Sequence, residues 1–378
     1  MGKWAGKYVI GLTGNIGTGK SVVRRMLEHM GAFGIDADAL SHRAIAKGAP
    51  GHAKVIEAFG RWVVAPDGEI DRVKLGRLVF SDPAALAQLE AIVHPLVLQA
   101  VDWMIQRSSK TVIVIEAIKL LEASMHKHSD AVWVVTTPLE IQLARLMQKR
   151  GMSEAEARQR ITAQPPQEQK ISAASVVIKN VSSFEDTWRQ VSAAWQKTVP
   201  SLETAPSQPL KAGTLPQGDL TVARGRPRDS ENIAVLINRV RKDARVTTED
   251  IMNEFGDKAF LLIRAGERLI GVAGWQVENL VARTSEIILD AEAPPAQVLP
   301  PLIQEMERAS KDLQCEAALI ITAPNISDDK VWKGMGYERR TPQSLGVSAW
   351  QEAAKETLKP GLVLYFKQLR QDRVLRPI

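Results

Sequence analysis

A glycine-rich stretch near the N-terminus has the residue types and spacing of a phosphate-binding loop. The segment "IGLTGNIGTGKSVVRRM" (residues 10–26) places Gly14, Gly19, Lys20 and Ser21 in the pattern G-x-x-x-x-G-K-S. Glycines let the backbone turn tightly, so that successive N–H groups point at a phosphate, and a helix expected from Lys20 adds its positive end. In such a loop the lysine bridges the β- and γ-phosphates and the serine hydroxyl ligates Mg²⁺. The pattern predicts a site for a nucleoside triphosphate.

Residues outside the loop narrow the class of protein. The sequence has no Asn-Lys-x-Asp pattern, which a GTPase uses to read its base. Motor-type ATPases usually have an apolar strand that ends in paired acids, whereas "VIVIEA" (residues 112–117) supplies Glu116 alone. The remaining candidate is a kinase that acts on a small molecule.

Such a kinase needs a base beside the acceptor hydroxyl, and "IDADALSHR" (residues 35–43) offers two carboxylates. Asp36 and Asp38 follow an expected strand, and side chains at i and i+2 share a face if the strand continues. Asp38, the outer of the two, is the better candidate base. Capping of the following helix remains an alternative role for both acids, and Glu116 is the alternative base.

Charge on the transferring phosphoryl group must be neutralised from outside the loop. The segment "RLMQKRGMSEAEARQRITAQ" is expected to form two helices and contains four arginines: Arg145, Arg150, Arg158 and Arg160. The segment could close as a lid and bring an arginine to the γ-phosphate. The alternative is a solvated helix pair with Glu154 and Glu156 as partners, which we prefer for Arg158.

Two further features have competing interpretations. His94, in "IVHPLV", could bind a phosphate, but a histidine ahead of a proline in an apolar helix is more often structural. The segment "ARGRPRD" (residues 223–229) resembles an arginine hook for the DNA minor groove. Because it also lies where a strand should lead into a helix capped by Asp229, we expect no nucleic-acid partner.

The elements that must position these residues fall into two regions. Before residue 199, strand-like runs alternate with helical patterns, which predicts an α/β domain with a parallel sheet and ligands at the carboxyl ends of its strands. Residues 39–105 are helical and too long for a simple crossover, so we interpret them as an inserted acceptor-binding subdomain. After a Pro- and Ser-rich linker at residues 199–218, hairpin patterns and a helix at residues 298–313 predict a separate α+β domain over residues 219–378.

The composition of the chain limits the partners that the protein can have and its location in the cell. The one cysteine, Cys315, excludes an internal disulfide, and no apolar run that we identify reaches the roughly 20 residues of a membrane span. Residues 1–200 contain 25 Lys and Arg against 19 Asp and Glu, so the positive excess lies in the half with the loop. We expect a cytoplasmic protein that meets small anions, with neither a membrane nor a nucleic acid as partner. The oligomeric state is left open.

Taken together, these motifs make residues 1–198 resemble the dephospho-coenzyme A kinase family. The likeness extends over "GLTGNIGTGKS", "IDADALSHR", "DGEIDRVKLGRLVFSDPAALAQLEAIVHPLV", "RLMQKRGMSEAEARQRITAQ" and "VVIKN". It implies a five-stranded P-loop kinase fold with a helical insertion and a lid. The implied reaction transfers the γ-phosphate of ATP to the ribose 3′-hydroxyl of dephospho-coenzyme A, with Mg²⁺ as cofactor.

The resemblance also assigns roles to residues. It implies Asp38, Lys20 and Arg145 as catalytic, and Asp36, Asp38, His94 and Arg150 as substrate-binding, with Ser21 on Mg²⁺. The nucleotide loop that it implies consists of Gly14, Asn15, Gly17, Thr18, Gly19, Lys20, Ser21 and Val22. The sequence departs from the family at "IKLLE", where Pro-Leu-Leu-x-Glu is usual, and at "RGM", where Arg-Asp-Gly is usual. A nucleotide or nucleoside kinase, or a nucleotide sensor, is the alternative.

Residues 219–378 are similar to GNAT-type acetyltransferases in their order of elements and in "APNISDDKVWKGMGYE". The glycine-rich pyrophosphate loop expected before the long helix is replaced by "DAEAPPAQVLPPL", whose prolines have no N–H to donate. Trp332 stands where that family often has a tyrosine acid. The sequence therefore predicts a degenerate acetyltransferase fold that binds or regulates, with an active acetyltransferase as the alternative.

Overall fold

The computed structural model describes residues 3–200, 210–215, 218–241, 245–371 and 374–375. Its internal contacts divide these residues into two compact units. The first contains the chain up to Lys20 together with Phe33–Val177, and the second contains Ser21–Ala32 together with the described residues from Ile178 to Gln371. The two sheets are described separately below, and α1 (Lys20–His29) and α9 (Phe184–Thr198) are given with the first sheet although these contacts place them in the second unit, except for Lys20.

A five-stranded sheet forms the centre of the first region, with the strand order β2-β3-β1-β4-β5. The register is parallel between β1 and β3, β1 and β4, and β2 and β3. The inner strands are apolar and buried on both faces, as a parallel sheet between helical layers requires. The strands are β1 (Tyr8–Thr13), β2 (Phe33–Asp36), β3 (Val112–Glu116), β4 (Ala131–Thr136) and β5 (Val176–Lys179).

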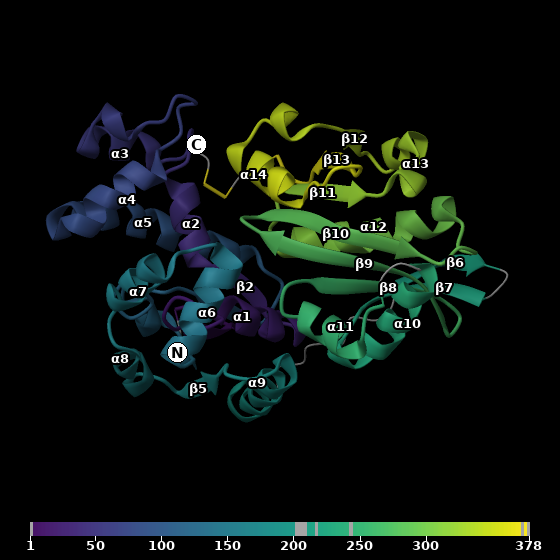
Figure 1. The fold of residues 1–378 in the computed structure, drawn as a ribbon, viewed down its shortest axis with the longest axis horizontal. Coiled ribbons are helices and arrows are strands. Elements are labelled where there is room, and N and C mark those ends of the chain that lie inside the picture. The colour runs from purple at the N-terminus through teal and green to yellow at the C-terminus, as the bar shows by residue number, and fades with distance from the viewer. Residues whose placement is uncertain (1–2, 201–209, 216–217, 242–244, 372–373, 376–378) are drawn as a thin grey trace. The chain divides into compact units, whose positions relative to one another are not determined.

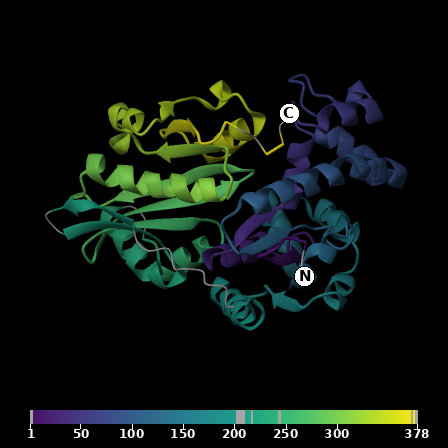
Figure 2. The same cartoon turned by 180° about the vertical axis from the view of Figure 1, so that it is seen from behind.

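Helices of the first region supply the insertion and the lid. Helices α2, α3 and α4 each contact the long helix α5, and Figures 1 and 2 show α3, α4 and α5 grouped to one side of the sheet. Helix α6 contacts α7. The bounds are α1 (Lys20–His29), α2 (Ala37–Ala44), α3 (His52–Phe59), α4 (Arg72–Ser81), α5 (Pro83–Arg107), α6 (Leu139–Arg150), α7 (Glu154–Thr162), α8 (Gln167–Ser172) and α9 (Phe184–Thr198).

An eight-stranded sheet forms the second unit, with the order β12-β13-β11-β10-β9-β8-β7-β6. Its pairs are antiparallel except β10 with β11, which run parallel over Val281–Arg283. The strands are β6 (Leu210–Leu215), β7 (Gly218–Arg224), β8 (Ala259–Ala265), β9 (Arg268–Glu278), β10 (Val281–Leu289), β11 (Ala317–Thr322), β12 (Glu338–Arg339) and β13 (Val363–Gln368). The helices are α10 (Ser230–Val240), α11 (Thr248–Glu254), α12 (Pro295–Asp312), α13 (Asp329–Gly334) and α14 (Ser348–Thr357). The predicted α+β character is confirmed.

Both faces of this larger sheet are covered by helices. Along β11, Ile320 packs in one apolar cluster with Leu302 and Met306 of α12, while Leu319 packs in another with Trp350 of α14. The alternation follows from the period of two along a strand. Figure 2 shows the light-green helix α12 lying across one face of the sheet, and Figure 1 shows α10 and α11 on the other.

The region between the two predicted domains contains more structure than the sequence suggests. Residues 201–209 and 216–217 of the predicted linker lie outside the described residues, but Leu210–Leu215 forms strand β6, which pairs with β7. Regular structure thus begins before residue 219. The exact domain boundaries stay a prediction.

One helix is long and apolar enough to span a membrane. It is α5, and length and composition alone give that result for the described residues. The sequence analysis did not identify this segment as such a run. In the fold, Leu96, Val97, Val101 and Ile105 of α5 are buried, and α2, α3 and α4 contact the helix, so part of its apolar surface packs on protein.

Candidate active site

The glycine-rich loop connects β1 to α1 in the conformation that its glycines allow. Gly14 and Gly17 have φ of +151° and +77°. A Cβ on Gly14 would lie 2.4 Å from the Val135 carbonyl oxygen, so no larger residue fits there without displacing the backbone. Lys20 is 7% exposed, and its Nζ lies 3.4 Å from the Asn15 carbonyl oxygen. The lysine side chain therefore folds back over the loop that it follows.

The segment that follows the lid helix α7 is attached to this loop. The Asn15 side-chain amide donates to the Pro165 carbonyl at 3.0 Å, and the Ile16 N–H donates to Gln164 Oε1 at 2.8 Å. From α6, Arg145 Nη1 lies 3.4 Å from the Gly17 carbonyl oxygen and 3.3 Å from that of Thr18. The lid segment thus supplies one arginine directly at the loop.

The structure separates the two candidate acids, Asp36 and Asp38. Strand β2 ends at Asp36, which caps α2 by accepting from the Ala39 N–H at 2.8 Å. Asp36 and Asp38 would share a face only if the strand continued to Asp38, and it does not, because α2 starts at Ala37 and places Asp38 in its first turn. The helix-capping alternative is therefore correct for Asp36.

Asp38 has a different partner, far away in the sequence. Its Oδ2 and Oδ1 accept from the Ile118 N–H at 3.1 and 3.3 Å. Burial is the main reason that the pKa of Asp38 is raised from its usual 3.8 to about 6, and the carboxylates of Asp36 and Glu116 act in the same direction. Lys20 and the Ile118 N–H oppose this rise. At neutral pH the group is a carboxylate that can accept a proton.

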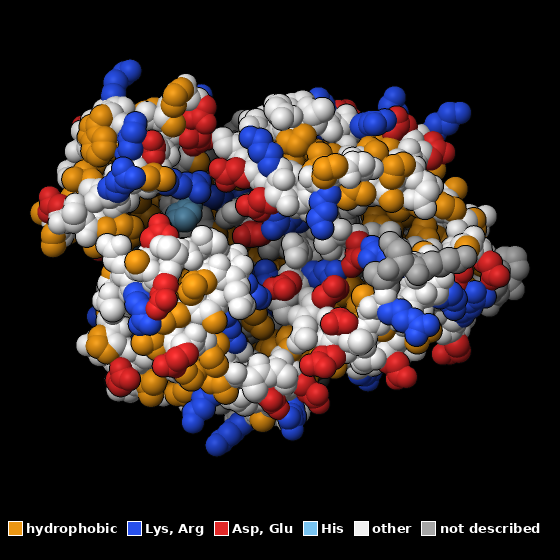
Figure 3. All heavy atoms as spheres, viewed as in Figure 1, with side chains coloured by type: hydrophobic (Ala, Val, Ile, Leu, Met, Phe, Trp, Pro, Cys, Tyr) orange, Lys and Arg blue, Asp and Glu red, His pale blue; other side chains and the backbone are white. Residues whose placement is uncertain are grey.

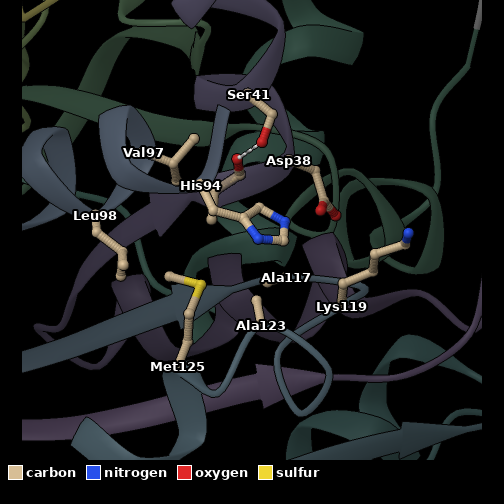
Figure 4. A pocket seen from close by; sticks show the side chains of 10 residues that line it. Asp38, Ser41, His94, Val97, Leu98, Ala117, Lys119, Ala123 and Met125 are labelled. Carbon is tan, nitrogen blue, oxygen red and sulfur yellow. Dashed lines mark hydrogen bonds between the residues drawn. The ribbon is translucent and has the colours of Figure 1, made fainter. Parts of the chain in front are cut away.

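A pocket lies beside this carboxylate. Figure 4 shows the imidazole of His94 between apolar side chains on one side and the Asp38 carboxylate and the Lys119 side chain on the other. The lining comes from α2, α5 and the residues that follow β3: Ala37, Asp38, Ser41, His94, Val97, Leu98, Ala117, Lys119, Ala123 and Met125. Its empty volume is about 370 Å³, and it combines one carboxylate, one imidazole and one ammonium with an apolar wall. His94 is thus brought to Asp38.

The residues at the loop suit a triphosphate that carries its own metal ion. The first turn of α1 and the ammonium of Lys20 supply positive charge, and Ser21 supplies a hydroxyl oxygen, a ligand type that Mg²⁺ accepts. The described residues contain no group of three or more His, Cys, Asp or Glu side chains placed to hold a metal.

The other lid arginines are not brought to the loop. Arg150 is the last residue of α6 and is exposed. Arg158 pairs with Glu154 at 2.7 Å on the surface of α7, as the preferred interpretation expected, and Arg160 is also exposed. Of the four, Arg145 is the one whose hydrogen bonds reach the loop.

Sequence reasoning missed two lysines and a backbone group near Asp38. Lys119 lines the pocket and pairs with Glu90 at 2.5 Å, and Lys170, in α8, donates to the Ile118 carbonyl at 2.7 Å. Both lysines lie in stretches without a strong motif. The change from Pro-Leu-Leu to "IKL" was the available signal for Lys119, whereas no local pattern marks Lys170 as buried.

In the second unit, the features expected of an acetyltransferase site are altered. Trp332 is fully buried, its Nε1 donates to the Ile326 carbonyl at 3.0 Å, and its ring stacks on Tyr365. Helix α12 has Pro294 as N-cap and Pro295 as its first residue, so N–H donors are missing at its start. Glu292 lines the open hollow beside this turn, together with both prolines.

Charged side chains of both signs are interspersed on the face of the molecule in Figure 3. The positive excess of residues 1–200 does not gather there into one large basic patch.

Comparison with known proteins gives separate results for the two halves. Residues 8–186 match the family model described as dephospho-CoA kinase. The curated dephospho-CoA kinase of Geobacter metallireducens is 43% identical over 194 residues, which are 50% of this chain and 96% of that protein. The enzyme of Streptomyces avermitilis is 44% identical over 191 residues, 50% of this chain and 93% of that protein.

Solved structures are similar to each half. The crystal structure of TT1252 from Thermus thermophilus is 35% identical, covers 51% of this chain and 98% of its own, and has a TM-score of 0.47. A GNAT-family acetyltransferase from Staphylococcus aureus covers 40% of this chain and 99% of its own, with 12% identity and a TM-score of 0.33.

Proposed function

The chain belongs to the dephospho-CoA kinase family, and from that premise we propose how its residues divide the work of phosphorylating dephospho-CoA. Lys20 and the backbone of Gly14–Ser21 hold the phosphates of ATP. Arg145 neutralises charge on the transferring group, and Ser21 ligates Mg²⁺. When bound, that ion would neutralise charge between the phosphates.

The observation that carries the proposal is the position of Asp38. Its carboxylate lines the pocket with His94 and Lys119, and it lies close enough to Lys20 for that ammonium to lower the pKa of Asp38. One carboxylate thus belongs to both the acceptor pocket and the surroundings of the phosphate loop. This is where a base for an acceptor hydroxyl is needed.

The chemical step follows from this arrangement. The 3′-hydroxyl oxygen of dephospho-CoA attacks the γ-phosphorus of ATP, and its proton moves to an Asp38 carboxylate oxygen. The bond from the γ-phosphorus to the bridging oxygen breaks, and ADP leaves with both bonding electrons. Asp38 then returns its proton to solvent. The pKa of about 6 makes it a carboxylate at the start of the cycle at neutral pH.

Replacement of the base tests this assignment. Asp38→Asn keeps the size of the side chain and removes its capacity to take a proton, so kcat should fall at least about a hundredfold. A coupled ADP-release assay with dephospho-CoA measures the effect. Asp82→Asn is the matched control, since Asp82 caps α5 by accepting from the Ala84 N–H at 2.8 Å and asparagine caps a helix about as well, so kcat should stay near that of the wild type.

Two outcomes would contradict the proposal. A near-normal kcat for Asp38→Asn would move the role of base to Glu116. Turnover of the wild-type protein with a nucleoside monophosphate in place of dephospho-CoA would favour the nucleotide kinase reading.

For the second unit we propose a binding or regulatory role without acetyl transfer. The enclosed Trp332, with its N–H already bonded to Ile326, has no proton available for a leaving thiolate. An assay for amine-dependent thiol release from acetyl-coenzyme A tests this, and clear release would overturn it.

A cytoplasmic location of the protein remains part of the proposal.

A further inference from the structure

Lys170 is the most deeply buried cation near the proposed active site. It lies in α8, is 1% exposed, and its Nζ donates to the Ile118 carbonyl at 2.7 Å. Glu122 Oε1 lies 3.9 Å from the same nitrogen. Burial of a charged group costs free energy unless partners compensate for lost water, so a buried lysine needs a structural or functional reason.

The carbonyl that Lys170 binds belongs to a residue that also holds Asp38. The Ile118 N–H donates to the Asp38 carboxylate, and the Ile118 carbonyl accepts from both Lys170 and Thr13 Oγ1, the latter at 3.1 Å. Thr13 is the last residue of β1, directly before Gly14 of the phosphate loop. The two peptide groups around Ile118 therefore connect the base, the start of the loop and α8.

Helix α8 follows the segment that is bonded to the phosphate loop. Gln164 and Pro165 accept from Ile16 and Asn15, and Gln167 Nε2 donates to the Thr137 carbonyl at 3.3 Å. The chain from the end of the lid to Lys170 is thus attached at the loop, at Thr137 directly after β4, and at Ile118. A displacement of this segment would move the Ile118 backbone, whose N–H binds Asp38.

We propose that Lys170 is a positioning residue for the kinase reaction: it fixes the Ile118 peptide, and through it the orientation of Asp38, from the segment that ends the lid. This inference rests on the proposed role of Asp38 as base. Lys170 itself touches no reacting atom. Its ammonium also faces the same group of charges as Asp38, since Lys20, Glu122 and Asp38 all influence the pKa of Lys170.

The charge of Lys170 gives the inference a measurable signature. The charged groups around Asp38 are Lys20, Asp36 and Glu116, and the pocket adds His94 and Lys119. Removal of one nearby positive charge disfavours the carboxylate, so the pKa of Asp38 should rise. The acid limb of the kcat profile should then move to higher pH.

The experiment compares Lys170→Met with Lys170→Arg in the full chain. For Lys170→Met we expect kcat with dephospho-CoA to fall about tenfold to a hundredfold, because small misplacement of a reacting group has effects of this size. We expect KM for ATP to change less, and the acid limb to move up. Lys170→Arg keeps the positive charge and the hydrogen-bond donor. This variant should therefore have most of the wild-type kcat, and the acid limb of its pH profile should lie at the wild-type pH.

Controls separate this inference from a general effect. Lys127→Met makes the same change at an exposed lysine and should leave kcat and the acid limb unchanged. If Lys170→Met does not fold, Lys170→Gln is used instead, because it keeps a hydrogen-bond donor without the charge. The acid limb of its kcat profile should still move to higher pH. A folded Lys170→Met or Lys170→Gln with wild-type kcat and limb would overturn the inference.

If the proposed role of Asp38 as base is wrong, the experiments give a different result. The Asp38→Asn variant then keeps nearly normal kinase activity, whatever the effect of changing Lys170. An inactive Asp38→Asn beside a fully active Lys170→Met would remove the role of Lys170 alone.

Discussion

Two turns in this molecule lead from a strand region into a helix, and they differ in the N–H donors and the charged side chains that phosphate binding needs. The turn before α1 has glycines with positive φ, a lysine that folds back over it, and Arg145 nearby. The turn before α12 has Pro294 and Pro295, and the acidic Glu292 beside it. Both helices present the positive end of a dipole.

The difference shows that a helix N-terminus alone does not make a phosphate site. The dipole needs free N–H groups that point at the ligand and a side-chain cation that neutralises it. The first turn supplies both, whereas prolines remove N–H donors from the second, and Glu292 beside it pairs with the nearby cation Arg268 at 2.9 Å. The contrast agrees with a kinase site in the first region and with the lack of acetyl transfer proposed for the second.

The largest effect that sharpens the comparison should come from Gly14→Ala. The new Cβ would lie 2.4 Å from the Val135 carbonyl oxygen, and the positive φ adds strain of about 1–3 kcal/mol. Because the loop must shift, we expect kcat/KM for ATP to fall about a hundredfold in the coupled ADP-release assay.

The matched control for this variant is Gly48→Ala. Gly48 also has positive φ, +77°, but no atom lies within 4 Å of its would-be Cβ. It should lower the temperature of unfolding while leaving kcat/KM within about twofold. Equal activity losses in the two variants would mean that strain in general, and not the shape of the loop, limits the reaction.

The next effect is the pH dependence of the kinase. Asp38 must be ionised to take a proton, so kcat should be constant above its pKa of about 6 and fall as pH decreases below it. At one pH unit below that pKa we expect about a tenfold loss, measured with saturating substrates. A flat profile between pH 5 and 7 would contradict the role of Asp38.

Stability of the second unit must be followed in the same experiment. His29 Nε2 donates a hydrogen bond to the Phe255 carbonyl at 3.0 Å, and burial, with Arg224 and Arg25 nearby, lowers the pKa of His29 from 6.5 to about 3. The unfolded chain then binds the proton more readily, so stability falls as pH decreases below about 6.5. Circular dichroism at each pH distinguishes loss of activity from loss of structure.

The smallest effect concerns the second turn. Glu292→Lys places a cation beside α12, but Pro294 and Pro295 still provide no N–H groups. Calorimetric titration with ADP should therefore give one site per chain in both the wild type and the variant. A second site in the variant would mean that charge alone separates the two turns, and the comparison would then need revision.

Local sequence predicted the parts of the site whose residues are consecutive. Gly14, Lys20 and Ser21 act through the conformation of one short loop, and that conformation depends on which residues tolerate positive φ. The alternation of strands and helices likewise predicted the parallel sheet, because residues buried on both faces give continuous apolar runs. The family resemblance rested on the loop and also on "IDADALSHR", the inserted helices and the lid segment.

Local sequence patterns were not sufficient where a side chain has a partner that the pattern does not include. The rule that side chains at i and i+2 share a face applies to Asp36 and Asp38 only if the strand continues, yet α2 begins at Ala37 because Asp36 can cap it. The burial of Lys170 could not be predicted either, since its compensating partner, the Ile118 carbonyl, lies 52 positions away in the chain.

The sequence by itself therefore predicted a triphosphate site, the loop that would form it, and the kind of fold. The tertiary structure alone decided which acid lines the pocket with His94 and what holds that acid there. The physical reason is the range of the interactions. Backbone conformation and helix caps are set within a few residues, whereas the contact of Asp38 with Ile118 spans 80 residues and exists only when β3 and α2 have come together.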